Sequence, residues 1–193
     1  MTVSNAAESP PAPSSVSTLI SSTPTPATPY SATAAQVLHS LQHQHLWTSL
    51  ETHPLTIPNS ESPIYLISGI PPHRVYTHPD EQLFMLEKGL RDEDIPPERV
   101  FALPLAQGQS WSLRRMAAVF DSLSDEDVEP EISEEGEKAQ KLTEYYEGRK
   151  VARATKEWGG KRMLLAMIDK GMGGDGTVVY YVIQEGAVKP RQN

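Results

Sequence analysis

The chain has 193 residues, no cysteine and a formal net charge of -8. Its length suits one domain with tails, and the lack of cysteine excludes a disulfide framework, a thiolate zinc site and a cysteine nucleophile. No apolar run approaches the roughly 20 residues that cross a bilayer, and no secretory signal opens the chain, so we expect a soluble, intracellular protein.

The negative charge is concentrated in one stretch. Eight of the 25 acidic residues lie between Asp125 and Glu137, where no basic residue occurs, and the rest of the chain carries no net charge. A neutral surface exerts no general attraction on nucleic acid, so any RNA contact has to be local or supplied by partners. The charge distribution therefore favours a scaffold over a free-standing RNA-binding protein.

The N-terminal segment, residues 1–32, is predicted to be a disordered tail. Its first thirty residues hold six prolines, many serines and threonines, and a single charge at Glu8. Such a segment has too little apolar surface to offset the entropy of ordering. Order is expected to begin at Thr33, which forms a capping box with Gln36.

A helix from Ala34 to about Leu50 is predicted next. On a 3.6-residue period, two nearly opposite faces are apolar. The first comprises Ala34, Val37, Leu38, Leu41 and His45, and the second comprises Leu46, Trp47 and Leu50. The helix therefore either packs on two sides or ends before Leu50.

Short elements follow in the middle of the chain. Pro63 to Ser68 and Val100 to Leu105 are predicted strands, Gly69 to Pro72 is a turn, and Glu81 to Leu90 is a predicted helix.

A further helix is predicted to end at Leu123, with Ser110 or Ser112 as its N-cap. Its buried face is expected to comprise Leu113, Met116, Ala117 and Phe120.

The acidic stretch is then an exposed loop, followed by a predicted helix from Lys138 to Trp158. Gly148 weakens that helix by about 1 kcal/mol relative to alanine. Its inward residues are expected to be Leu142, Tyr145, Tyr146 and Ala152. Strands and helices mixed in this way indicate an α/β or α+β domain.

The C-terminal part is predicted to be a β-hairpin. Met163 to Ile168 and Thr177 to Ile183 are apolar runs separated by a glycine-rich turn. Side chains alternate between the two faces of a strand, and both faces of the second strand are apolar. One face comprises Val179, Tyr181 and Ile183, and the other comprises Val178, Tyr180 and Val182. Such a strand is either a helix-covered central strand or a protein interface.

This hairpin resembles the C-terminal part of a known protein family. Three upstream segments match the same family in order and spacing: Leu41 to Trp47 (LQHQHLW), Ser68 to Tyr76 (SGIPPHRVY) and Trp111 to Leu123 (WSLRRMAAVFDSL). The family is the smallest, non-catalytic subunit of the eukaryotic tRNA-splicing endonuclease in its fungal form. The resemblance covers residues 33 to 193 and implies a single nuclease-like α/β domain, with a mixed sheet, flanking helices, and an acidic loop and insertion helix at about residues 124–160.

The resemblance also implies partners and a location. Subunits of this family form a heterotetramer that excises introns from precursor tRNA, and they associate through their C-terminal strands, with an acidic loop reaching toward the neighbour. The implied interface residues here are Val178, Val179, Tyr180, Tyr181, Val182, Ile183 and, in the candidate loop, Asp175. The implied location is the nucleus or the cytosolic face of the mitochondrial outer membrane. A self-complementary strand edge would also allow a homodimer of the isolated chain, and neither a cofactor nor membrane insertion is expected.

Two other functions are open at this stage. One is an RNA-cleaving enzyme that uses His73, Tyr76 and His78 as acid and base, with Arg74 as the phosphate cation. The other is an adaptor unrelated to splicing that binds through strand addition or its proline-rich tail. Catalytic subunits of the family use a tyrosine, a histidine and a lysine in the C-terminal domain. No histidine follows His78, so no catalytic residue is carried over.

Two further clusters are candidate sites. His39, His43 and His45 invite a metal, but no carboxylate or cysteine completes a ligand set nearby, so no metal site is predicted. The predicted insertion helix is rich in basic residues, of which Lys150, Arg153 and Lys156 are candidate RNA contacts. The acidic residues interleaved with them favour an ordinary solvated helix face instead.

Overall fold

A five-stranded mixed sheet forms the centre of the protein in the computed structural model, which describes residues 13–22, 29–57, 63–106, 108–123, 136–155, 157–168 and 177–185. The strands lie in the order β1-β2-β3-β4-β5. Their bounds are β1 Thr48–Leu55, β2 Ile64–Ile70, β3 Val100–Ala106, β4 Arg162–Ile168 and β5 Val178–Gln184. The pair β3 and β4 is parallel, and the other neighbouring pairs are antiparallel. The predicted α/β class and the C-terminal hairpin are confirmed.

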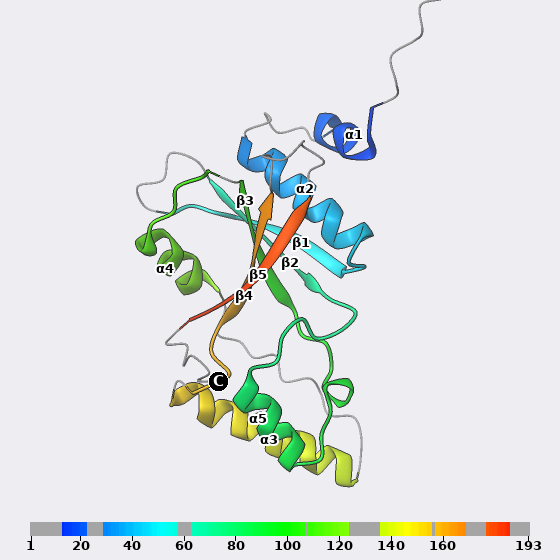
Figure 1. The fold of residues 1–193 in the computed structure, drawn as a ribbon, viewed down its shortest axis with the longest axis vertical. Helices are drawn as coiled ribbons and strands as arrows, with labels where there is room; N and C mark the ends of the chain where they lie inside the picture. The colour runs from blue at the N-terminus through cyan, green and yellow to red at the C-terminus, as the bar shows by residue number, and fades with distance from the viewer. Residues whose placement is uncertain are drawn as a thin grey trace, which may run out of the picture.

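Helices cover both faces of this sheet and one of its ends. The helices are α1 Ser15–Ser22, α2 Pro29–His43, α3 Pro79–Glu87, α4 Leu113–Ser122 and α5 Glu137–Ala154, with a short 3₁₀ helix, η1 Asp92–Asp94. Helix α2 lies against one sheet face and α4 against the other, whereas α3 and α5 pack together beyond the end of the sheet (Figure 1).

Successive side chains of a strand point to opposite faces of the sheet, so a central strand packs against helices on both faces. In β4, Met163 packs into the α4-side core with Phe120, while its neighbour Leu164 packs into the α2-side core with Leu41. A strand buried on both faces therefore reads as a continuous apolar run. A third apolar cluster, built around Tyr145 and Trp158, joins α3 to α5.

The predicted start of helix α2 at Ala34 is wrong, whereas the alternative that it ends before Leu50 is confirmed. Helix α2 starts at Pro29, a residue suited to a first helical turn, so Thr33 and Gln36 lie inside it and form no N-terminal capping box. It stops at His43, and the Trp47 N–H then donates to the Leu41 carbonyl oxygen at 2.9 Å.

Residues beyond that stop belong to a turn and an edge strand. Leu46 has a positive φ of 56°, Trp47 packs into the α2-side core, and Leu50 lies in β1. The prediction that His45 is a core residue is also wrong, because its side chain is exposed and meets the Tyr180 ring edge-on at 4.9 Å.

Part of the predicted disordered tail is helical. Within residues 1–32 the structure describes α1 and the start of α2. The Ser14 Oγ accepts a hydrogen bond from the Ser17 N–H at 3.1 Å, which caps α1. The rest of that tail, the acidic stretch at residues 124–135 and the hairpin turn at residues 169–176 lie outside the described residues, so the predicted boundaries of the tail and the acidic loop stay predictions.

The predicted Ser112 N-cap of α4 is confirmed, since its Oγ accepts from the Arg115 N–H at 3.2 Å. The predicted buried face of α4 is wrong in part, because Leu113 is 91% exposed and Ala117 is also exposed. The helix turns a face centred on Val119 and Phe120 toward the sheet.

The predicted inward residues of α5 are confirmed, and they are joined by Arg149. The helix ends at Ala154 rather than Trp158.

Gly148 owes its place in α5 to packing rather than to helix propensity. A Cβ at this position would stand 2.5 Å from Phe84 Cζ, and the Phe84 ring is backed by Trp158, with ring centroids 5.5 Å apart. The absence of a side chain is what lets α3 approach α5 closely.

We therefore expect Gly148→Ala to lower the free energy of unfolding by about 1 kcal/mol in a urea titration. Overpacking costs about 1–3 kcal/mol, which exceeds the gain of about 1 kcal/mol in helix propensity. Thr143→Ala, at an exposed position of the same helix, serves as the control and should change stability by no more than about 0.5 kcal/mol. A Gly148→Ala protein more stable than wild type would contradict this account of the packing.

Candidate functional site

Strand β5 is an edge strand. It pairs with β4 from Arg162 opposite Gln184 to Ile168 opposite Val178, and no strand of the described residues pairs with its other side. An edge strand presents a row of backbone N–H and C=O groups that another chain can bond.

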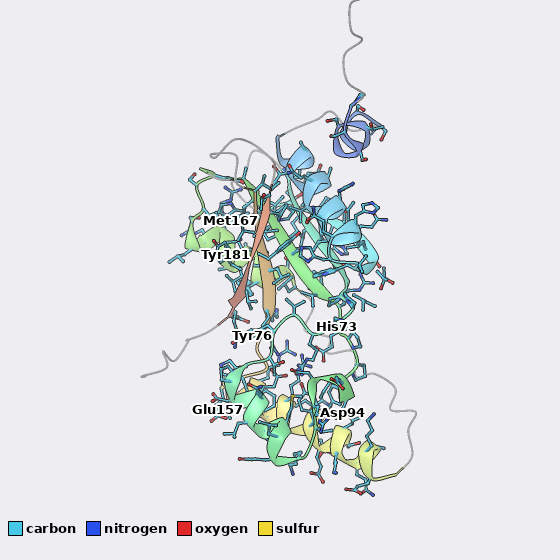
Figure 2. The ribbon with its side chains drawn as sticks, turned by 45° about the vertical axis from the view of Figure 1, so that its right-hand side comes forward. His73, Tyr76, Asp94, Glu157, Met167 and Tyr181 are labelled. Carbon is cyan, nitrogen blue, oxygen red and sulfur yellow. The ribbon has the colours of Figure 1, made fainter. Side chains whose placement is uncertain are left out.

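The β5 edge is also apolar. Val179, Tyr181 and Val182 are 40%, 52% and 39% exposed, and we refer to these three residues as the β5 edge surface. Met167 of β4 lies opposite Val179 in the register, so the apolar surface continues onto the sheet face around Met167 and Tyr181 (Figure 2).

The remaining β5 side chains are held by the protein's own core. Val178 and Tyr180 pack into the α2-side core, and Ile183 packs into the α4-side core. The Tyr180 hydroxyl donates to Ser40 Oγ at 3.1 Å, and burial raises the pKa of Tyr180, which keeps that hydroxyl protonated. The core thus holds β5 from both faces of the sheet, while Val179, Tyr181 and Val182 remain exposed.

The opposite edge of the sheet, β1, has several features that block strand addition. It contains Pro54, which has no N–H, and the charged Glu51. Its register shifts between Thr48 and Glu51, where Ser49 has a positive φ of 49°. Proline, charge and irregular pairing are the usual means of protecting an edge, so the apolar open edge is β5.

A basic cleft of about 590 Å³ lies where the sheet meets the helical pair. Basic side chains in its lining outnumber acidic ones, of which Glu98 is the single example among the described lining residues. The basic residues that line it are Arg74, Arg99, Arg149, Arg153, Lys161 and Arg162.

A buried carboxylate, Glu81, organises one wall of this cleft. Its side chain is 0% exposed. The oxygen Oε1 accepts hydrogen bonds from Arg74 Nη2 at 2.7 Å and from the Tyr145 hydroxyl at 2.6 Å. The oxygen Oε2 accepts from Arg162 Nη2 at 3.1 Å and from the His78 N–H at 3.3 Å. We call Glu81 with Arg74, Tyr145 and Arg162 the Glu81 cluster.

The protonation states of Glu81 and Tyr145 follow from the charges around them. Burial by itself would raise the pKa of Glu81, but the guanidinium groups of Arg162 and Arg74 and the Tyr145 hydroxyl outweigh it and lower the pKa to about 2. Burial, together with the charge of Glu81, raises the pKa of Tyr145. The tyrosine therefore stays a hydrogen-bond donor and Glu81 stays ionised at neutral pH.

Two more arginines of the cleft are fixed by side chains of the sheet end. Arg149 forms a two-point ion pair with Glu98, including Nη2 to Oε2 at 2.9 Å. Arg99 donates to Ser68 Oγ at 2.8 Å and lies 3.1 Å from Glu51 Oε1. Four cations of the cleft, Arg74, Arg99, Arg149 and Arg162, are therefore held in defined positions before any ligand arrives.

Comparison with known proteins gives the family of the chain. The family model described as Sen15 protein matches residues 36–134 and 130–193. The chain belongs to the Sen15 protein family. It is 37% identical over 161 residues, 81% of its length, to the "Probable tRNA-splicing endonuclease subunit tsp-1" of Neurospora crassa, and it spans 64% of the length of that protein. The predicted resemblance is confirmed, and the α/β fold suits this family.

In this Sen15 family member the histidine and tyrosine proposed for RNA cleavage have separate positions at the junction of sheet and helices (Figure 2). His78 is the N-cap of α3, where Nδ1 accepts from the Asp80 N–H at 3.2 Å. Tyr76 lies under the Arg162 guanidinium, and His73 is exposed in the loop. Arg74, the predicted phosphate cation, is bound to Glu81.

The remaining predicted site residues divide into three groups. His39 and His43 have ring centroids 4.5 Å apart, but within the described ranges no three metal-ligating side chains gather. Arg153 lines the cleft, and Lys150 is exposed on α5. Lys156 and Asp175 lie outside the described residues. None of the described helices is long and apolar enough to span a membrane.

The contacts of Glu81 should contribute strongly to the stability of the fold. Glu81→Gln should lower the free energy of unfolding by about 3 kcal/mol, because it leaves two largely buried guanidinium groups without their carboxylate. Glu144→Gln removes a carboxylate that is 53% exposed and lies 2.7 Å from Lys88 Nζ. This control should cost no more than about 1 kcal/mol. Equal losses in the two variants in urea would contradict the role assigned to the cluster.

Lowering the pH should also destabilise the wild type, because it protonates Glu81. The pKa of folded Glu81 lies below its ordinary value of 4.5, so its ion pairs stabilise the fold fully above pH 4.5 and are lost as the pH falls toward 2. The wild type should lose up to about 3 kcal/mol more than Glu81→Gln across this range. Parallel curves for the two proteins would exclude Glu81 as the responsible group.

Proposed function

We propose that this protein is a non-catalytic, structural subunit of the tRNA-splicing endonuclease, which joins a catalytic subunit of similar fold through β5 and so supports intron excision from precursor tRNA. The observation that carries the proposal is an apolar, open β5 edge in a chain of the Sen15 family. The tRNA-splicing role itself draws on the name of the Neurospora crassa relative.

Strand addition or face-to-face contact at β5 is favoured on physical grounds. A partner strand would bond the outer N–H and C=O groups of β5 and would remove Val179 and Tyr181 from water. Val178, Tyr180 and Ile183 of β5 already pack on the core, so little of the strand needs to be reordered on binding. The same edge gives the isolated chain a route to a homodimer.

The partner is expected to bind β5 and not β1. We therefore expect Tyr181→Asp and Val179→Asp to abolish co-purification of the other endonuclease subunits from the native cells, with affinity reduced at least about 30-fold, the effect of losing a central apolar contact. Thr52→Asp places the same charge at an exposed position of β1 and should leave co-purification intact. Thermal unfolding of each variant checks that the fold is retained.

Three outcomes would count against the proposal. Absence of endonuclease subunits from the wild-type sample would contradict the splicing assignment. Loss of the partners in Thr52→Asp but not in Tyr181→Asp would contradict the use of β5. Loss of the partners on removal of residues 1–28, with retention in Tyr181→Asp, would favour the adaptor alternative.

The non-catalytic assignment is supported by the lack of any histidine after His78. The purified chain should therefore not cleave precursor tRNA in the presence of a metal chelator. The alternative RNA-cleaving enzyme would cleave under these conditions and would lose that activity in His73→Ala. Cleavage with this dependence on His73 would overturn the structural role.

We place the protein in the nucleus, with the cytosolic face of the mitochondrial outer membrane as the alternative. Both locations are those that the family resemblance implies. A fluorescent fusion expressed from the native locus separates them, because a mitochondrial-surface protein would outline the organelle.

A further inference from the structure

We propose that the basic cleft between the end of the sheet and α5 binds a single-stranded segment of RNA, with phosphates held by its arginines and a base stacked at Tyr76. The inference rests on the proposed function to the extent that the endonuclease brings RNA to this surface. It adds an RNA contact to a subunit that is otherwise proposed to bind protein.

The charge of the cleft sets it apart from the rest of the molecule. The chain as a whole carries a formal charge of -8, yet six basic residues and one acidic residue line this cleft among those described. Among the described residues, Glu51, Glu81 and Asp92 also contact these cations. Local cationic clefts attract phosphates even on a negatively charged protein.

The mouth of the cleft offers a stacking surface. Tyr76 is 37% exposed, and the Arg162 guanidinium lies 5.7 Å from the centroid of its ring. Unpaired RNA bases stack on tyrosine rings and on arginine planes. Arginine is also the side chain whose planar donors fit phosphate oxygens best.

The floor of the cleft is apolar, with Phe101, Met163 and Leu164 among its residues. This combination favours a nucleotide over an acidic peptide, because a nucleotide presents an aromatic face as well as an anion. A glutamate or aspartate side chain would use the arginines but would gain nothing from the ring or the apolar floor. Glu81 and Glu98 fix Arg74, Arg149 and Arg162, so these three side chains lose little freedom when a ligand binds.

The cleft adjoins the proposed protein interface. Val182 belongs to the β5 edge surface and also lines the cleft. An RNA strand in the cleft would therefore lie beside a subunit bound at β5. This places the proposed RNA contact where the two subunits meet.

The test uses the full-length chain and a short fluorescein-labelled oligouridylate, followed by fluorescence anisotropy across a salt series. Arg153→Gln and Tyr76→Ala are each expected to weaken binding about tenfold, the effect of losing one charge-assisted hydrogen bond or one stacked base. Arg153→Gln should also reduce the slope of log K against log salt by about 1. Lys141→Gln removes a charge from the same helix outside the cleft and should bind like the wild type.

Several results would overturn the inference. They are no measurable binding by the wild type, an equal loss in all three variants, no loss in Arg153→Gln and Tyr76→Ala, or displacement of the RNA by poly-glutamate at equal charge concentration. The last result would assign the cleft to an acidic protein segment.

Thermal unfolding and co-purification of the endonuclease subunits are measured on the same variants. Arg153→Gln should assemble normally, because its side chain lies outside the β5 edge surface. Normal assembly without RNA binding would reject this inference and leave the proposed function standing. Absence of the subunits from the wild-type sample would reject the proposed function independently.

Discussion

The Glu81 carboxylate is the contact on which the arrangement of this protein depends. It accepts hydrogen bonds from Arg74 in the loop after β2, from Tyr145 on α5 and from Arg162 at the start of β4. A fully buried charge is tolerated only when paired and bonded in this way. The contact therefore ties the helical pair to the sheet and fixes the base of the C-terminal hairpin, since Arg162 pairs with Gln184.

The two edges of the sheet, β1 and β5, differ in how well they are protected. Helices α2 and α4 bury the two faces of the sheet, and β1 is protected by Pro54, Glu51 and its irregular register. Strand β5 has Val178, Tyr180 and Ile183 packed on the core, and Val179, Tyr181 and Val182 exposed. The open, apolar edge of the sheet therefore lies next to a cleft in which the Glu81 cluster holds Arg74 and Arg162 in position.

Features set by local sequence were predictable, and features set by distant contacts were not. The two strands of the hairpin, the strand at residues 100–106 and the Ser112 cap follow from alternation and from a residue's own neighbours. The side-chain donors to Glu81 lie 7, 64 and 81 residues away, so no spacing rule reveals the cluster. The two opposed apolar faces of residues 34–50 left the end of the helix open, because the turn at Leu46 depends on a positive φ that leucine seldom adopts.

The most direct test of the central claim is amide hydrogen exchange of β5, compared between the free chain and the assembled endonuclease. If β5 is the docking edge, the amides of Val178–Gln184 that point away from β4 should exchange readily in the free chain and become protected on assembly, while those of β1 change little. Unchanged exchange in β5, with new protection at β1 or on the helical pair, would contradict the account.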